Sequence, residues 1–305
     1  MLRLLAIPLL LAATGVAAQG TAAIRDGWEL GLRYWYSSGI ARWSHNAQSI
    51  DPSVGNPTSI LTYDEVTAHA IELHARKNFG HRWFVRGNVG LGGIRHGSLD
   101  DEDYAAGQVK FSDSTSPVKG NRLTYASLDL GRDLWVIGEG NTTVGLFAGY
   151  HHWSERLDAF GATYSVNFVG APSIDTSVRV LSNEAKWSSL RAGVTFSTHI
   201  MNPTTKLSID AAWVPYARLS NEDSHFLRSD FGPTPNLFIN GRGYGVQLDL
   251  ELRHAISDGW ELGAGLRHWW LRTSRGDVST VTFSAPLVEL ESQRTGVTLS
   301  ATRRW

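Results

Sequence analysis

Residues 241–255 read GRGYGVQLDLELRHA, and apolar and polar side chains alternate along this stretch. One face would carry Tyr244, Val246, Leu248, Leu250 and Leu252. The other would carry Gly243, Gly245, Gln247, Asp249, Glu251 and Arg253. Because successive side chains of a strand point to opposite faces, this pattern predicts a β-strand with one apolar and one charged face. A strand of a soluble sandwich would also alternate, so the rest of the chain has to decide between the two folds.

The same alternation recurs at 122–136 and at 297–305, where the chain ends in Trp305. Four short segments rich in Gly, Asn, Asp or Pro have the composition of tight turns: 78–82, 138–141, 201–205 and 256–260. Longer polar segments separate them, at 44–57, 99–121, 160–185, 221–238 and 275–291. Short turns that alternate with long loops are typical of a transmembrane β-barrel.

We therefore predict an all-β fold, a ten-stranded antiparallel transmembrane β-barrel with long outer loops and short periplasmic turns. Four turns and two termini on one side of the membrane require this even number of strands. The terminal aromatic residue resembles the end of bacterial outer-membrane barrels, and we expect outward Trp and Tyr at both membrane interfaces.

The first eighteen residues, MLRLLAIPLLLAATGVAA, have the pattern of a secretory signal peptide. Arg3 supplies the positive charge, the apolar stretch 4–13 is too short to span a bilayer, and small residues precede the expected cleavage after Ala18. The prediction is therefore a signal peptide at 1–18 and a barrel at 19–305 in the bacterial outer membrane.

Composition narrows the chemistry and the partners. The chain has no cysteine and a formal net charge of −1, so we expect neither thiolate chemistry nor nucleic-acid binding. The histidines at 69, 74 and 96 lack metal-ligand spacing, and no metal or other cofactor is expected.

Residues 99–104, LDDEDY, place four acids in a row. On a strand, Asp101 and Asp103 would share one face, and Asp100 and Glu102 the other. Crowded carboxylates raise each other's proton affinity, which favours a role with water, a proton or a cation. Taken alone, the run is compatible with a solvated loop, a weak cation site or a catalytic pair.

A second polar cluster lies at 220–230, SNEDSHFLRSD. Asp223 and His225 are again two residues apart and would share a face if the strand persists. A carboxylate beside an imidazole orients the ring and stabilises its protonated form, as a general base requires. A single Asp-x-His pair is also common on ordinary protein surfaces.

The two clusters together resemble the omptins, a family of ten-stranded outer-membrane proteases. The similar stretches are GNVGLGGIRHGSLDDEDY (87–104), LGLRYWYSSGIARW (30–43), GLFAGYHHW (145–153) and ARLSNEDSHF (217–226). The resemblance implies that Asp101 and Asp103 match the family's Asp pair, and that Asp223 and His225 match its Asp-His pair. It also implies a monomer that hydrolyses peptides or proteins outside the cell and binds outer-membrane lipid, including lipopolysaccharide, which its activity would require.

The pattern departs from the family at two substrate-binding positions. Omptins use two acidic residues to bind basic substrates, and these positions correspond to Trp43 and Asn221 here. A preference for Arg or Lys at the cleavage site is therefore not expected.

Three functions follow from a barrel with these residues. The first is an omptin-like aspartyl endopeptidase that uses Asp101, Asp103, Asp223 and His225. The alternative is an omptin-fold barrel without proteolysis, acting as an adhesin or surface-ligand receptor. A small pore is the third, and it is disfavoured because inward Asp249, Glu251 and Arg253 would fill much of a narrow lumen.

Overall fold

The computed structural model of the chain describes residues 27–138 and 141–305. The predicted signal peptide at 1–18 lies outside the described residues, as do residues 139 and 140 of one predicted turn. Within the described ranges, no helix is long and apolar enough to cross a membrane.

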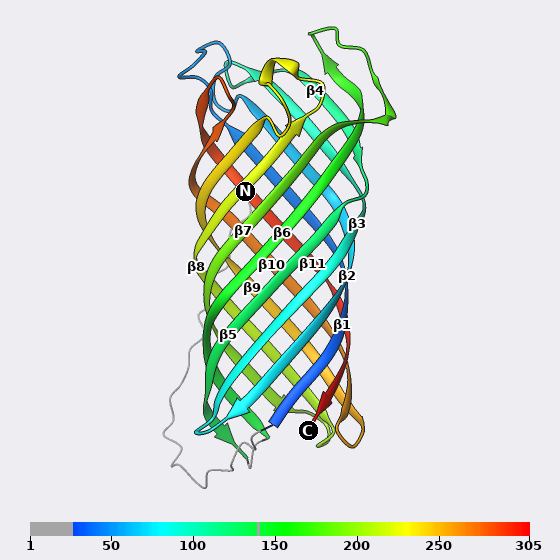
Figure 1. Cartoon of the computed structure of the whole chain (residues 1–305), viewed down its shortest axis with the longest axis vertical. Helices are drawn as coiled ribbons and strands as arrows, with labels where there is room; N and C mark the ends of the chain where they lie inside the picture. The colour runs from blue at the N-terminus through cyan, green and yellow to red at the C-terminus, as the bar shows by residue number, and fades with distance from the viewer. Residues whose placement is uncertain (1–26, 139–140) are drawn as a thin grey trace.

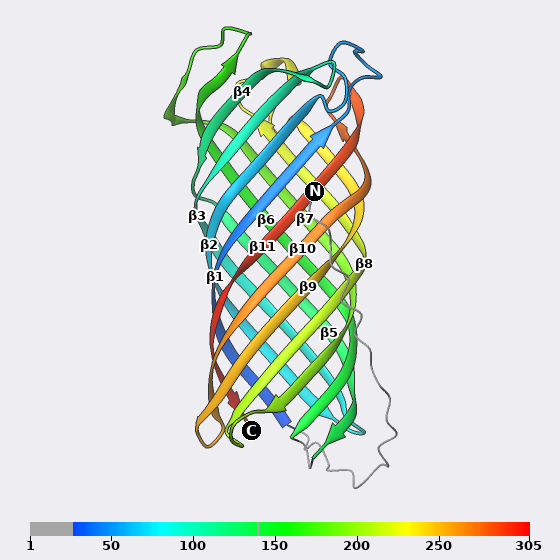
Figure 2. The ribbon, with the colours of Figure 1, turned by 180° about the vertical axis from the view of Figure 1, so that it is seen from behind.

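The described chain is almost entirely β-structure, with one short 3₁₀ helix, η1 (Ser229–Phe231). In chain order the strands are β1 (Gly27–His45), β2 (Ser59–Phe79), β3 (Trp83–Ala105), β4 (Val109–Val118), β5 (Arg122–Ile137), β6 (Thr142–Asn167), β7 (Ile174–His199), β8 (Thr205–His225), β9 (Leu237–Ser257), β10 (Trp260–Ser279) and β11 (Ser284–Arg304). They wind into a tall cylinder (Figure 1). The ring closes because β1 pairs with β2 on one side and with β11 on the other (Figure 2). A closed ring leaves no sheet edge exposed to lipid.

The eleven strands make ten passages around the ring, as predicted. β4 and β5 are two parts of one passage, because both pair with β3 on one side and β6 on the other. β4 pairs with the upper part of β3, from Gly97 to Ala105, and β5 with its lower part, from Trp83 to Gly93. The short segment 119–121 joins the two parts.

The strands continue well above the expected membrane zone, so several predicted loops are wrong. The segment 99–121 is mostly the β3–β4 hairpin, which turns within 106–108, and the segment 160–185 is mostly the β6–β7 hairpin. That hairpin rises beyond the others at the mouth (Figure 1). Polar residues on both faces hide the alternation there, although the backbone ladder continues.

Large apolar side chains are exposed on the outer face of the lower barrel. On β3 they end at Leu91, which is 67% exposed, and on β8 they end at Tyr216. Exposed Trp28, Trp83, Trp135, Trp260 and Trp305 lie near the end that carries the C-terminus. A transmembrane strand needs about nine to eleven residues, whereas β6 has 26. The upper parts of the long strands therefore stand outside the membrane.

The middle of the lumen is filled by aromatic side chains. The cluster contains Trp35, Tyr125, Trp153, Trp187 and Trp269, all exposed by 2% or less. The ring centroids of Trp35 and Tyr125 lie 4.9 and 5.0 Å from that of Trp269. Gly90 faces Tyr125 across the β3–β5 ladder, where a Cβ atom would lie 2.1 Å from the tyrosine ring. Glycine at this position lets the aromatic ring lie flat on the neighbouring strand.

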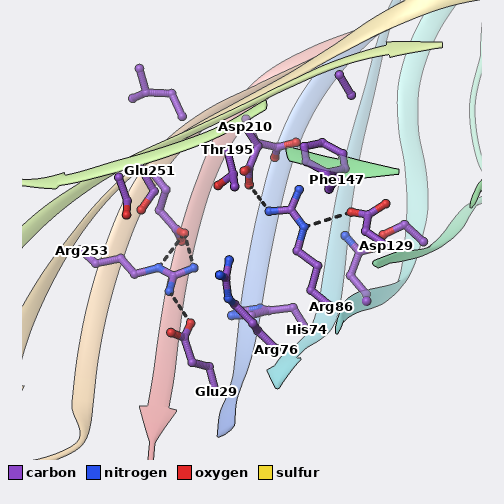
Figure 3. A pocket seen from close by; sticks show the side chains of 18 of the residues that line it. Glu29, His74, Arg76, Arg86, Asp129, Phe147, Thr195, Asp210, Glu251 and Arg253 are labelled. Carbon is purple, nitrogen blue, oxygen red and sulfur yellow. Dashed lines mark hydrogen bonds and ion pairs between the residues drawn. The ribbon is translucent and has the colours of Figure 1, made fainter. Parts of the chain in front are cut away.

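Below the aromatic cluster, a cavity of about 390 Å³ is lined by charged residues (Figure 3). Glu72 accepts hydrogen bonds from Arg33 and Arg267, each at 2.7 Å. Arg86 bridges Asp129 at 3.0 Å and Asp210 at 2.7 Å. The Arg267–Glu72 pair links β10 to β2, and the Arg86–Asp210 pair links β3 to β8. These strands are not neighbours in the ring, so the two pairs brace the lower barrel from inside.

Candidate functional site at the mouth of the barrel

The strand periodicity directs both predicted pairs into the lumen. On β3, Leu99 is fully buried in the core, so Asp101 and Asp103 share its inward face. On β8, Leu219 is fully buried in the same core, and Asp223 on the same face has no exposed surface. His225 follows two residues later, and its side chain is 14% exposed. The four predicted catalytic residues thus come together on the inside of the upper barrel.

The acidic run is part of a sheet and not a solvated loop. Asp101 lies opposite Leu61 of β2, and Asp103 lies opposite Ser59. On the outer face, Thr115 donates a hydrogen bond to Asp100 at 2.9 Å, and Lys110 forms an ion pair with Glu102. The outer pair therefore faces away from the inner pair, as the alternation predicted.

Asn236, which was not predicted from the sequence, holds the Asp-His pair in place. The Asn236 side chain accepts a hydrogen bond from the His225 backbone N–H at 2.9 Å and donates one to the His225 carbonyl at 3.1 Å. The Asn236 backbone N–H donates to the Asp223 carbonyl at 3.2 Å. Asn236 precedes β9, and no local motif links it to His225. It fixes the end of β8 against the loop that follows.

The two pairs influence each other across the mouth. Burial and the charge of Asp103 raise the pKa of Asp101 to about 7, while His225 opposes this rise. Burial also raises the pKa of Asp103. For His225, burial lowers the pKa, but the Asp223 carboxylate more than offsets this effect and the pKa lies above its ordinary value. The pKa values of Asp101 and His225 therefore depend on each other's charge.

Several polar atoms at this site have no hydrogen-bond partner within 27–138 and 141–305. They include both carboxylate oxygens of Asp223 and Nε2 of His225. This nitrogen lies 3.7 Å from Oδ2 of Asp223. Leaving buried polar groups unpaired costs about 1–3 kcal/mol each. Such a cost is tolerated where the groups serve a ligand or a reaction.

The two predicted substrate-binding residues are buried beside the pairs. Trp43 on β1 is 2% exposed and lies opposite Leu61, in line with Asp101. Asn221 on β8 is 1% exposed and exchanges two side-chain hydrogen bonds with Asn183 of β7, at 2.8 and 3.3 Å. Both side chains are uncharged and Asn221 is already engaged, so neither supplies a negative charge for a basic substrate.

Two further inward side chains near the pairs were not singled out from the sequence. Tyr63 of β2 is fully buried, and its hydroxyl has no hydrogen-bond partner among the described residues. Burial, together with Asp223, Asp101 and Asp158, raises the pKa of Tyr63 well above its ordinary value, so the phenol stays neutral. His45 of β1 lies opposite Ser59, in line with Asp103. Alternation along the chain could have placed Tyr63 inward, whereas His45 lies in the segment 44–57 that was predicted to be a loop.

The site is separate from the cavity in the lower barrel. The residues that line that cavity include Arg86, Glu251 and Arg253 (Figure 3). None of the four predicted catalytic residues lines it. In the part of the chain that the structure describes, no group of three or more His, Cys, Asp or Glu side chains is arranged to hold a metal ion.

The family model described as Pom, Protochlamydia outer membrane protein, matches residues 33–303. The chain belongs to this family. It is a protein of the bacterial outer membrane, and the closed ring with an apolar outer face is the structure that this location requires. No curated protein matches the sequence.

Among solved structures, the barrel is similar to the outer membrane protease OmpT from Escherichia coli, with a TM-score of 0.74 and 12% identity over 92% of this chain and 97% of that chain. At this identity the likeness shows the fold alone. Ail from Yersinia pestis matches with a TM-score of 0.30 and 10% identity, over 92% of this chain and 100% of that chain. The translocator domain of NalP from Neisseria meningitidis matches at 0.37 and 9%, over 90% and 88%. The resemblance to the omptins thus holds for the fold.

Proposed function

We propose that this barrel is an omptin-like endopeptidase that hydrolyses peptide bonds at its outer mouth. Asp101 and Asp103 would hold a water molecule, and His225 would act as the general base. Asp223 would stabilise the imidazolium that forms. The observation that carries the proposal is the convergence of two inward polar pairs, Asp101 with Asp103 and Asp223 with His225, on the inner face of the mouth.

The proposed reaction needs no covalent enzyme intermediate. The water oxygen bonds to the peptide carbonyl carbon while His225 takes a proton from the water. The carbon–nitrogen bond then breaks, and the leaving amine receives the proton from His225. General-base assistance contributes about 10²–10⁴-fold, so alignment by the rigid strands has to supply much of the remaining acceleration.

The proposed substrate preference follows from the two uncharged positions. An acidic side chain beside the bound peptide would favour Arg or Lys, but Trp43 and the Asn221–Asn183 amide pair offer no such charge. We expect an apolar or polar uncharged residue to be favoured beside Trp43.

Lipopolysaccharide is the proposed lipid partner, and three arginines on the outer face support it. Arg218 and Arg275 each lie opposite Arg242, so like charges adjoin across β8, β9 and β10. All three are exposed, and none forms an ion pair with a described residue. Adjacent like charges are destabilising without an anion between them. Arg218 and Arg242 lie two residues above exposed Tyr216 and Tyr244 on the same strands. Tyrosine is typical of the membrane interface, so arginines at this height would suit lipid phosphates.

A non-proteolytic adhesin or receptor is the second candidate function. The β6–β7 hairpin extends beyond the other strands, and at its tip Phe168 is 79% exposed and Val169 is 59% exposed. An exposed apolar tip is a suitable contact for another surface. This candidate requires no reaction at the mouth.

Peptide cleavage by the refolded barrel separates the two candidates. The full chain, refolded in detergent with lipopolysaccharide, should cleave members of a peptide library. His225→Ala should lose this activity and keep the heat-modifiable migration of a folded barrel, whereas exposed His96→Ala should retain both. No cleavage in any preparation would leave the receptor as the better account. Equal cleavage by His225→Ala and the wild type would contradict the proposed role of His225.

A further inference from the structure

The strand register places a third group beside the two polar pairs. Across β1, β2 and β3, His45, Ser59 and Asp103 lie side by side in one row, and Trp43, Leu61 and Asp101 form the next. Trp43 is buried inward, and His45 lies two residues further on the same strand. His45 therefore borders the gap that Asp103 faces.

The environment of His45 favours an uncharged ring. Its ring centroid lies 5.8 Å from that of Trp43, at an interplanar angle of 30°. His45 Nδ1 is buried and has no hydrogen-bond partner among the residues that the structure describes. Burial and the nearby charge of His225 lower the pKa of His45 to about 4. The ring is thus a neutral imidazole near His225, with a buried nitrogen that no described residue satisfies.

We propose that His45 is a catalytic residue whose ring N–H donates a hydrogen bond to the carbonyl oxygen of the bound peptide. This inference rests on the proposed endopeptidase function. When water adds to the carbonyl carbon, this oxygen takes on negative charge, and the hydrogen bond strengthens without transfer of a proton. A neutral imidazole suits this role, because the second histidine, His225, can then take the proton from water.

The alternative is that His45 only packs against Trp43. Packing predicts an effect on stability, whereas oxyanion stabilisation predicts an effect on kcat. Removal of one such donor lowers kcat by about 10²–10³-fold with little change in KM. It also weakens the binding of a tetrahedral transition-state analogue by a similar factor.

The test compares His45→Phe, which keeps a ring without an N–H, with His45→Gln, which keeps an amide N–H donor. Both are assayed on the peptide that the refolded wild type cleaves best, and with a phosphonamidate analogue of it. His45→Phe should lose about 10²–10³-fold in kcat and bind the analogue correspondingly less tightly, while His45→Gln retains part of both. His45→Leu replaces His45→Phe if that variant does not show heat-modifiable migration.

The outcomes separate this inference from the function on which it rests. Wild-type kcat in the folded Phe or Leu variant would overturn the role of His45 and leave the endopeptidase intact. A variant that is impaired only in KM or in stability, and that binds the analogue as tightly relative to the substrate as the wild type does, would also overturn the role of His45 and leave the endopeptidase intact. A wild-type barrel that cleaves no peptide would overturn both.

Discussion

Two fully buried carboxylates, Glu72 in the lower lumen and Asp223 at the mouth, differ in how they are satisfied. In the lower lumen, Glu72 is fully buried between Arg33 and Arg267, and each arginine lies 2.7 Å from a separate carboxylate oxygen. At the mouth, Asp223 is equally buried, yet its nearest cation is His225 at 3.7 Å, and neither carboxylate oxygen has a hydrogen-bond partner in the described chain. Burial with complete pairing indicates a structural role, and burial without it indicates a site prepared for a reaction or a ligand.

The largest expected effect concerns the lower lumen. Glu72→Ala should destabilise the barrel by about 3 kcal/mol, the lower end for breaking a buried ion pair. Arg33 and Arg267 lose the carboxylate that they share, and each keeps one other partner, Glu251 and Asp249. Denaturant titration of the refolded protein would measure this loss. The activity of the folded fraction should be unchanged.

The matched control is Glu289→Ala near the surface. Glu289 pairs with Arg42 and Arg272, whose side chains are 45% and 44% exposed. Its removal should cost about 1 kcal/mol or less. A similar cost for both variants would show that the interior pairs do not brace the barrel.

The next largest effect concerns the mouth, where we expect a loss of activity and little change in stability. Asp223→Asn should slow peptide cleavage by about 100-fold, because the imidazolium of His225 loses its counter-charge, and should change stability little. Parallel activity assays and denaturant titrations would compare it with Glu72→Ala. If Asp223→Asn is destabilised and its folded fraction keeps full activity, Asp223 has a structural role, as Glu72 does.

The pH dependence sharpens the same comparison. The base form of His225 is needed for activity, and its pKa is raised after the Asp223 charge offsets the effect of burial, while the pKa of Asp101 is about 7. The rate should therefore rise as pH increases through about 7 and above. Asp223→Asn removes the charge that raises the pKa of His225, so its acid limb should move to lower pH. A limb that stays in place, or moves upward, would contradict this assignment.

The ring could be predicted from the sequence because every membrane-crossing stretch has to alternate, as in 241–255. The upper strands could not, because positions 100 to 103 are all acidic and the alternation disappears while the ladder continues. The aromatic cluster was also missed. The sequence did contain a signal for it. Trp35 lies two residues from Arg33, whose side chain points inward, so alternation along the strand would have placed Trp35 inside the barrel.

Only those residues of the candidate site that belong to a short sequence motif could be predicted. Asp101 with Asp103, and Asp223 with His225, each lie two residues apart on one strand. His45 and Asn236 reach the site through strand register and a loop contact, which local sequence does not encode.

The smallest expected effect is on specificity. Because Trp43 and Asn221 carry no charge, Arg beside the scissile bond should be preferred less than about tenfold over an uncharged residue, or about 1.4 kcal/mol. A peptide-library digest would measure this ratio. Strong selection for Arg would show that another carboxylate lines the substrate path.

The central claim is that the two pairs act together on one step, and a double-mutant cycle tests it most directly. Peptide cleavage is measured for Asp101→Asn, His225→Ala and the double variant, all refolded with lipopolysaccharide. Because groups that act on one step are not additive, the double variant should lose little more activity than His225→Ala alone. Losses that multiply would show that Asp101 and His225 act independently, and wild-type activity in His225→Ala would contradict the mechanism.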